Sequence, residues 1–196
     1  NADIDTLKGT SSRLRIGTTL PRAEMLRLAL MASENRAASA LGRNYPGGLR
    51  AFIQAMNYKA YELGMLDTHF VDPTGLNSNN ISTAEDLVKL VRAAYEYQEI
   101  RQESTAVSQA VSISGNRNPM NFVNTNALVR KGDWVIGLSK TGFISEAGRC
   151  LVMQAEIGGQ PLIIVLLDSA GKLTRIGDAN RIRKWIETTY FNARMG

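Results

Sequence analysis

Apolar residues in the first part of the chain recur at the spacing of α-helices. After Pro21, which suits the first turn of a helix, the run Met25–Ala32 is apolar nearly all round and predicts a buried helix. A second helix is expected from about Ser33 to Gly42, because the sequence from Asn44 to Gly48 is a strong turn signal. The chain therefore opens with two helices joined by a break.

Two further helices are predicted before residue 98. One runs from about Leu49 to Leu63 and stops at Gly64, and the other runs from about Thr83 to Tyr97 with Ser82 as its expected cap. The apolar residues at helical spacing are Phe52, Met56, Ala60 and Leu63 in the first and Leu87, Leu90, Val91 and Ala94 in the second. Residues 21–98 are thus expected to form a helical part.

The pattern changes after Glu103 to the period of two that is typical of β-strands. Short β-type pieces occur at residues 107, 110–113 and 121–123. Longer strands are predicted at 134–143, 149–157 and 161–167, and Gly158–Gln160 joins the last two as a tight turn. These three segments predict an antiparallel meander.

A last helix is expected from about Ile176 to Tyr190. It places Ile176, Ala179, Ile182 and Ile186 on one side, which would cover a face of the sheet. Residues 104–190 are thus expected to form the sheet and its closing helix. Helices followed by such a sheet predict an α+β fold. With 196 residues, the chain is expected to be one domain, 1–196.

Composition narrows the possible partners. No window approaches the ~20 apolar residues of a membrane-spanning helix, and the first twenty residues lack the pattern of a signal peptide. The net charge of +5 gives a mild attraction for polyanions, but the basic residues do not cluster, so no nucleic-acid partner is expected. Cys150 is the only cysteine and is expected to be a small core residue without a disulfide.

The first candidate for chemistry is the tripeptide Lys140-Thr141-Gly142. The period of two places Trp134, Ile136, Leu138 and Lys140 on one face of a strand, so a cation ends an apolar row. Such a lysine is either solvated or held in a site, where it binds an anion or assists proton transfer. Gly142 would let a peptide backbone approach and add as an extra strand.

The second candidate is Ser33-Glu34-Asn35, at the end of the first predicted helix. Ser33 and Asn35 can point into one cleft only if the helix breaks there, since positions i and i+2 do not share a helix face. The alternative is that one of them caps the second helix.

The two signals, in this order, resemble the S-x-N and K-T-G motifs of beta-lactam-recognising serine enzymes. Further motifs narrow the resemblance, which spans about residues 9–187, to the D-alanyl-D-alanine endopeptidases among the low-molecular-mass penicillin-binding proteins (the penicillin-binding protein 7 group). The segments that carry it are Ser33–Ala38, Tyr45–Gly48, Phe70–Leu76, Ser82–Ala84 with Asp86–Leu87, Lys140–Phe143, and Gly171–Lys172 with Asp178–Ala179.

The resemblance implies a serine peptidase with a DD-peptidase fold that works through an acyl-enzyme, without a cofactor or metal. It implies a proton relay at Ser33, amide binding at Asn35, positive charge at Lys140 and carboxylate binding at Thr141. Gly142 would also contact the substrate, and the backbone N–H of Phe143 would form half of an oxyanion hole. The implied partners are peptidoglycan peptides, with beta-lactams as covalent inhibitors, and the implied location is the periplasm.

The nucleophile of this family, in an S-x-x-K motif, is expected well before Ser33. The only S-x-x-K here is Ser169-Ala-Gly-Lys172, which comes after Lys140 and is not expected to be catalytic. We therefore expect an N-terminally incomplete domain, with the attacking serine outside this chain.

Other residues are expected to be structural. His69 is the only histidine and makes neither a triad nor a zinc site convincing. Asp72 and Asp133 are interpreted as turn residues. The alternatives that stay open are a DD-carboxypeptidase, a beta-lactamase of the same fold class, and a chain that by itself only binds.

Overall fold

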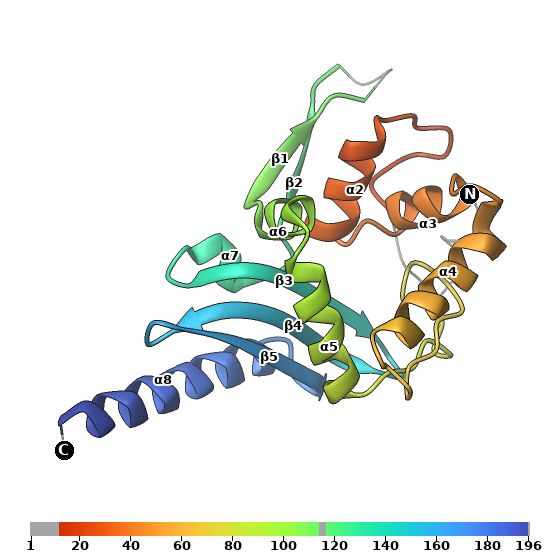
Figure 1. Ribbon diagram of the computed structural model, residues 1–196. Helices are drawn as coiled ribbons and strands as arrows, with labels where there is room; N and C mark the ends of the chain where they lie inside the picture. Colours follow the sequence, from red (N-terminus) through yellow and green to blue (C-terminus); the bar gives the residue numbers. More distant parts are fainter. Residues whose placement is uncertain (1–11, 114–116, 196) are drawn as a thin grey trace.

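The computed structural model describes residues 12–113 and 117–195 and shows a helical part beside a β-sheet (Figure 1). The helical part contains α2 (Arg22–Met31), α3 (Asn35–Arg43), α4 (Gly48–Glu62), α5 (Ala84–Tyr95) and α6 (Gln98–Thr105). The remaining elements are β1 (Ser108–Val111), β2 (Met120–Val123), α7 (Ala127–Lys131), β3 (Val135–Ile144), β4 (Gly148–Ile157), β5 (Gln160–Ser169) and α8 (Thr174–Met195). Helices combined with antiparallel sheets confirm the predicted α+β class.

The predicted helix ends are close to those in the structure. Pro21 directly precedes α2, and α4 ends at Glu62, before Gly64 with its φ of 70°. The expected cap of α5 was wrong by one residue: the Thr83 hydroxyl accepts the Asp86 N–H at 3.2 Å. The Ser82 hydroxyl instead lies 2.8 Å from that of Thr68 in the preceding loop.

Two short helices, α6 and α7, were not predicted. The sequence of α6 is largely polar, and α7 has only five residues, so neither shows a clear apolar period. Tertiary contacts hold both in place: the Ser104 hydroxyl of α6 accepts the Ser139 N–H at 3.3 Å. Asn126 caps α7 and donates to the Ser139 hydroxyl at 2.8 Å.

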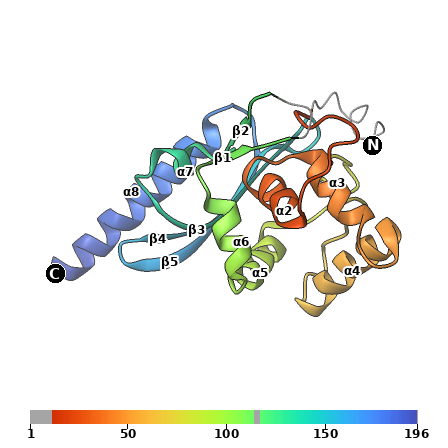
Figure 2. The same ribbon diagram turned by 90° about the horizontal axis from the view of Figure 1, so that it is seen from above.

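The main sheet has the strand order β3-β4-β5, all antiparallel, as the predicted meander requires. Helix α8 lies along one face, and α5 and α6 lie on the other (Figure 2). Strands β1 and β2 form a separate two-stranded sheet beside α2. The helical part therefore contacts the sheet through α5, on β4 and β5, and through α6, on β3, the strand that carries the Lys140 tripeptide.

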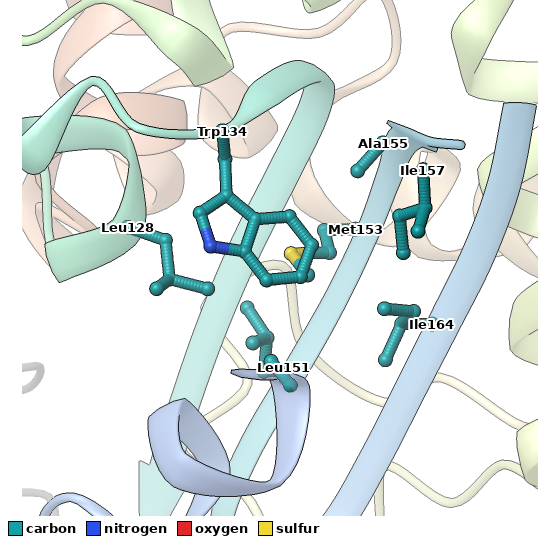
Figure 3. Close-up of a cluster of buried hydrophobic side chains, with 8 residues drawn as sticks. Leu128, Trp134, Leu151, Met153, Ala155, Ile157 and Ile164 are labelled. Carbon is teal, nitrogen blue, oxygen red and sulfur yellow. The ribbon is translucent and has the colours of Figure 1, made fainter. Parts of the chain in front are cut away.

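One core lies between the main sheet and α8 (Figure 3). Its buried members are Leu128, Trp134, Leu151, Met153, Ala155, Ile157, Ile164 and Ala179. The predicted apolar side of the last helix contacts it, since Ile176, Ile182 and Ile186 pack against this cluster. Burial of such side chains stabilises the fold by about 1.5–3 kcal/mol each.

A second core joins α2 to the small sheet, through Leu28 and Met31 of the helix and Val111 and Phe122 of the strands. Leu28 and Met31 are the only fully buried residues of α2, whereas its other apolar residues are half-buried or, at Ala23, exposed. The prediction of a helix buried all round was therefore wrong. No helix in the described ranges is both long and apolar enough to cross a bilayer.

The predicted apolar row on β3 is interrupted by a β-bulge between Ile136 and Leu138. Before the bulge Ile136 pairs with Ala155 of the α8-side core, whereas Leu138 pairs with Gln154. The extra residue, Gly137, has no room for a side chain, because a Cβ there would lie 2.5 Å from the Tyr95 ring. Leu138 and Lys140 thus face the helical part, on the side of the sheet opposite α8. The prediction that they share a face with Trp134 was wrong.

Candidate active site

The chain breaks between α2 and α3 at Ser33, as the cleft interpretation requires. Ser33 has a φ of 53°, which is rare for a residue with a side chain and ends the first helix sharply. The cap of α3 is Glu34, without a side-chain cap hydrogen bond, so neither Ser33 nor Asn35 caps this helix. The Met31 carbonyl anchors the break by accepting the Thr125 N–H at 3.0 Å.

Lys140 reaches this break from β3. Its Nζ donates to the Ser33 hydroxyl and, at 3.0 Å, to the carbonyl of Thr141. Burial of the ammonium group, with a smaller effect from the positive charge of Arg175, lowers the pKa of Lys140 to about 8. A lysine of this kind can take up or release a proton near neutral pH, next to a hydroxyl that can carry it.

On the opposite face of β3, Thr141 and Arg175 form a second polar group. The buried Thr141 hydroxyl donates to that of Thr125 at 2.7 Å. Arg175, in the first turn of α8, donates from Nη1 to the carbonyl of Gly142 at 3.2 Å. Burial and the nearby charge of Arg149 lower the pKa of Arg175, yet a guanidinium stays charged at neutral pH. A hydroxyl and a guanidinium together are suited to a carboxylate.

A loop closed by Asp72 forms the wall opposite β3. Its carboxylate accepts the backbone N–H of Gly75 at 3.0 Å and of Asn77 at 2.9 Å, and the Asn80 amide at 2.8 Å. Burial alone raises the pKa of Asp72, but hydrogen bonds led by those from Thr74 outweigh it and leave the pKa lowered. The expected role of Asp72 as a turn residue is confirmed.

These walls enclose a cleft of about 470 Å³. All six predicted site residues line it: Ser33, Asn35, Lys140, Thr141, Gly142 and Phe143. It is also lined by residues that sequence reasoning did not single out, which are Thr74, Gly75, Leu76, Thr125 and Arg175. Thr74–Leu76 lie in a motif that carried the family resemblance, whereas nothing in the local sequence marks Thr125 or Arg175.

Strand β3 is an edge of the main sheet as far as the structure describes it, and Gly142 is exposed on that edge. A Cβ at this position would meet only the Cβ of Cys150, at 3.7 Å. The edge is therefore open to an extended peptide, which could pair with β3 through backbone hydrogen bonds.

Several other residues lie away from the cleft. Ser169 is buried at the end of β5 and Lys172 is exposed, and neither lines the cleft, in line with the prediction that this S-x-x-K is not catalytic. His69 is exposed and pairs with Ile81 through the backbone. Within the described ranges, no group of three or more His, Cys, Asp and Glu residues could hold a metal ion.

The prediction for Cys150 was wrong. Its side chain is half-buried rather than in the core. It lies next to Gly142, on the face of the sheet that points toward the helical part. Its cross-strand partner Gly142 has no side chain that could cover it. The exposure therefore depends on strand pairing, and the apolar sequence around Cys150 gave no sign of it.

Comparison with known proteins agrees with this geometry. A sequence profile of the family described as D-alanyl-D-alanine carboxypeptidase matches residues 2–171. The D-alanyl-D-alanine endopeptidase of Pseudomonas aeruginosa is 46% identical over 187 residues, which cover 95% of this chain and 60% of that protein. The Escherichia coli K12 protein of the same name is 50% identical over 182 residues, which cover 93% and 59%.

Among solved structures, the Streptomyces K15 DD-transpeptidase is similar with a TM-score of 0.84 at 28% identity, over 94% of this chain and 74% of that one. The chain spans about three fifths of the length of the two curated endopeptidases it matches.

Proposed function

Because the chain belongs to the D-alanyl-D-alanine carboxypeptidase family, we propose that it forms most of a serine DD-peptidase domain that cleaves D-alanyl bonds in peptidoglycan cross-links. The observation that carries this proposal is the contact between Lys140 and Ser33 in a cleft that also holds Thr141 and Arg175. A cation beside a hydroxyl can move a proton, and a hydroxyl with a guanidinium can fix a carboxylate, which are the tasks that acyl transfer at a D-alanyl bond requires.

In this proposal Ser33 passes a proton to the leaving amine, and Lys140 supplies the positive charge that makes the transfer favourable. Asn35 hydrogen-bonds the amide of the substrate. Thr141 and Arg175 bind the carboxylate next to the scissile bond.

The substrate backbone lies along β3 beside Gly142, and the N–H of Phe143 is one of two donors to the oxyanion. In this proposal another part of the protein supplies the attacking serine, because the chain's only S-x-x-K, at Ser169, does not line the cleft.

Endopeptidase activity is favoured over carboxypeptidase activity by the relatives. The two at 46% and 50% identity are named endopeptidases. Relatives named carboxypeptidases, from Bacillus subtilis and Streptomyces, are 30% identical. The proposal includes a periplasmic location and acylation of the complete domain by beta-lactams.

The proposed function is tested with the complete protein and a purified cross-linked peptide dimer. We expect conversion to two monomers by mass spectrometry, loss of activity in Lys140→Met, and normal activity in the control Lys172→Met. Equal activity of both variants would contradict the proposal. Rapid multiple turnover of a chromogenic cephalosporin would instead support a beta-lactamase.

The chain by itself is expected to bind without forming a covalent bond. Incubation with fluorescent penicillin should leave no label after denaturation, because Ser33 and Lys140 lack an activated nucleophile. Stoichiometric label on Ser33 or Ser169 would contradict the placement of the nucleophile outside this chain.

A further inference from the structure

The hydrogen bond between Lys140 and Ser33 joins two elements that make few other contacts with each other. Ser33 follows α2, and Lys140 lies on β3. Helix α6 lies between the two elements in Figure 1 and packs against both of them, whereas α2 and β3 make few direct contacts. The place of Ser33 relative to Lys140 therefore depends on how α6 is attached on its two sides.

An ion pair attaches α6 to α2. The Arg27 guanidinium donates two hydrogen bonds to the Glu103 carboxylate, one from Nε to Oε2 and one from Nη2 to Oε1, the latter at 2.9 Å. The Glu103 side chain is only 14% exposed and that of Arg27 is 32% exposed, so water and salt screen the pair weakly. Two parallel bonds fix the direction of both side chains as well as their distance. The pair therefore holds α2 firmly against α6.

The next residue of α6, Ser104, attaches the same helix to β3. Its hydroxyl accepts the backbone N–H of Ser139, the residue before Lys140, at 3.3 Å. The Ser104 carbonyl accepts the Asn124 amide at 2.9 Å, so this end of α6 is itself held in place. Ser104, Asn124 and Ser139 are all buried, and a buried network of bonded polar groups is rigid. The side chains of Glu103 and Ser104 thus form a continuous connection from α2 to β3, the α6 link.

We propose that Glu103 and Ser104 are positioning residues for the proton relay between Ser33 and Lys140. Glu103 fixes α2 and with it Ser33, and Ser104 fixes β3 and with it Lys140. This inference rests on the proposed function, in which these two groups move a proton. Neither Glu103 nor Ser104 lines the cleft, so both act through the elements that they hold. Such placement matters because a displacement of about 1 Å can slow a reaction about 100-fold.

The pKa of Lys140 reports on the α6 link and can be measured in the chain alone, by NMR titration of the lysine side chain. Burial is the main cause that lowers this pKa to about 8, and neither Arg27 nor Glu103 is among the causes. Arg27→Met and Glu103→Met each break the ion pair but change the net charge in opposite directions. We expect the Lys140 pKa to rise toward 10.5 in both, because a loosened contact admits water to the ammonium group. Ser104→Ala should act in the same direction.

Ile164→Val is the control for a loss of stability alone. Ile164 belongs to the core between the main sheet and α8, where removal of a methyl group destabilises the fold without touching the α6 link. The Lys140 pKa should stay at about 8 in this variant. An unchanged Lys140 pKa in both methionine variants would overturn the proposal. Changes of opposite sign would also overturn it, because they would be the direct effect of the removed charges.

The double variant Arg27→Met/Glu103→Met tests whether the two residues act as a pair. Its Lys140 pKa should rise no further than in either single variant, since each substitution alone already removes the ion pair. A rise equal to the sum of the two single effects would show that Arg27 and Glu103 act separately, which contradicts the α6 link.

The complete protein gives a second readout, the rate of acylation by a fluorescent penicillin. The maximal rate should fall at least about tenfold in Arg27→Met and Glu103→Met and stay unchanged in Ile164→Val. The penicillin concentration that gives half of the maximal rate should change much less, because neither residue contacts the ligand. Equal rates in all three variants would overturn the positioning role. Failure of the unmodified protein to react would refute the proposed function, whereas the Lys140 pKa in the chain alone would still decide whether the α6 link exists.

Discussion

Lys140 and Ser33 are 107 residues apart in the sequence, yet the ammonium group of Lys140 donates a hydrogen bond to the Ser33 hydroxyl. Ser33 ends a helix of the helical part, and Lys140 projects from β3 of the sheet toward that part. The bond therefore lies where the two parts meet. A change in either residue should affect the cleft without changing the cores that hold each part together.

Replacing Lys140 with methionine should stabilise the chain at pH 7. The pKa of Lys140 is lowered from 10.5 to about 8, so the folded state disfavours the charged form. That penalty is fully present below pH 8 and disappears as the pH rises from 8 to 10.5. We expect Lys140→Met to be more stable by roughly 1–3 kcal/mol at pH 7 in urea denaturation.

The difference from the unmodified chain should shrink above pH 8 and nearly vanish by pH 10.5. Lys172→Met is the control, because Lys172 is exposed, and its stability should follow that of the unmodified chain at every pH. A constant difference for Lys140→Met across this range would show that Lys140 titrates normally.

Replacing Arg175 with glutamine should raise the pKa of Lys140, because the charge of Arg175 is one cause of its lowering. The pKa is measured by NMR titration of the lysine side chain. Arg149→Gln is the control, since the charge of Arg149 affects Arg175 and is not among the causes for Lys140. An unchanged Lys140 pKa in Arg175→Gln would contradict this electrostatic link.

The same Arg175→Gln variant should bind a peptide ending in D-Ala-D-Ala at least about tenfold more weakly, because a charge-assisted hydrogen bond contributes roughly 1.5–3 kcal/mol. Calorimetry with the free acid and with its C-terminal amide separates the carboxylate from the rest of the ligand. The loss should appear only with the acid. An equal loss with the amide would mean that Arg175 does not contact the carboxylate.

Two substitutions at Ser33 should separate the effect of backbone strain on stability from the effect of losing the hydroxyl. With a φ of 53°, a residue with a side chain is strained, and a β-branched one most of all. We expect Ser33→Val to be at least about 1 kcal/mol less stable than Ser33→Gly, although both lack the hydroxyl. Thermal unfolding checks this, and equal stability would mean that the backbone relaxes.

Asp72→Asn should loosen the loop that closes the cleft, because an amide cannot accept all the hydrogen bonds that the carboxylate accepts. We expect a loss of about 1–2 kcal/mol at pH 7, reduced from the usual value for a charged acceptor by partial exposure. Asp133→Asn is the control, since this side chain is exposed.

The effect of Asp72→Asn should also depend on pH. The pKa of Asp72 is lowered in the folded state, so its contribution is present above the ordinary value of 3.8 and is lost as the pH falls through the folded-state pKa. The stability difference between the two proteins should therefore narrow in strong acid. A difference that does not change with pH would contradict a role for the charged carboxylate.

Much of the fold was predictable, because the long elements have clear apolar periods. The helices α2 to α5, the meander β3-β4-β5 and the apolar side of α8 each follow from residues within one segment. The helices α6 and α7 escaped prediction since Ser104 and Asn126 hold them through bonds to Ser139, far along the chain. The same holds for the bulge at Gly137, which depends on the Tyr95 ring of α5.

The break at Ser33 and the end of the Lys140 strand could be located from the chain alone, because turn signals, periodicity and motifs are local properties of a chain. Packing in three dimensions was needed to show that these residues share a cleft, that Arg175 and Thr125 complete it, and that Cys150 lines a groove. Such features depend on strand register and on the packing of α8 and the helical part against the sheet. The single extra residue of the β-bulge places Lys140 on the face of β3 that points toward Ser33, instead of the face that carries Trp134.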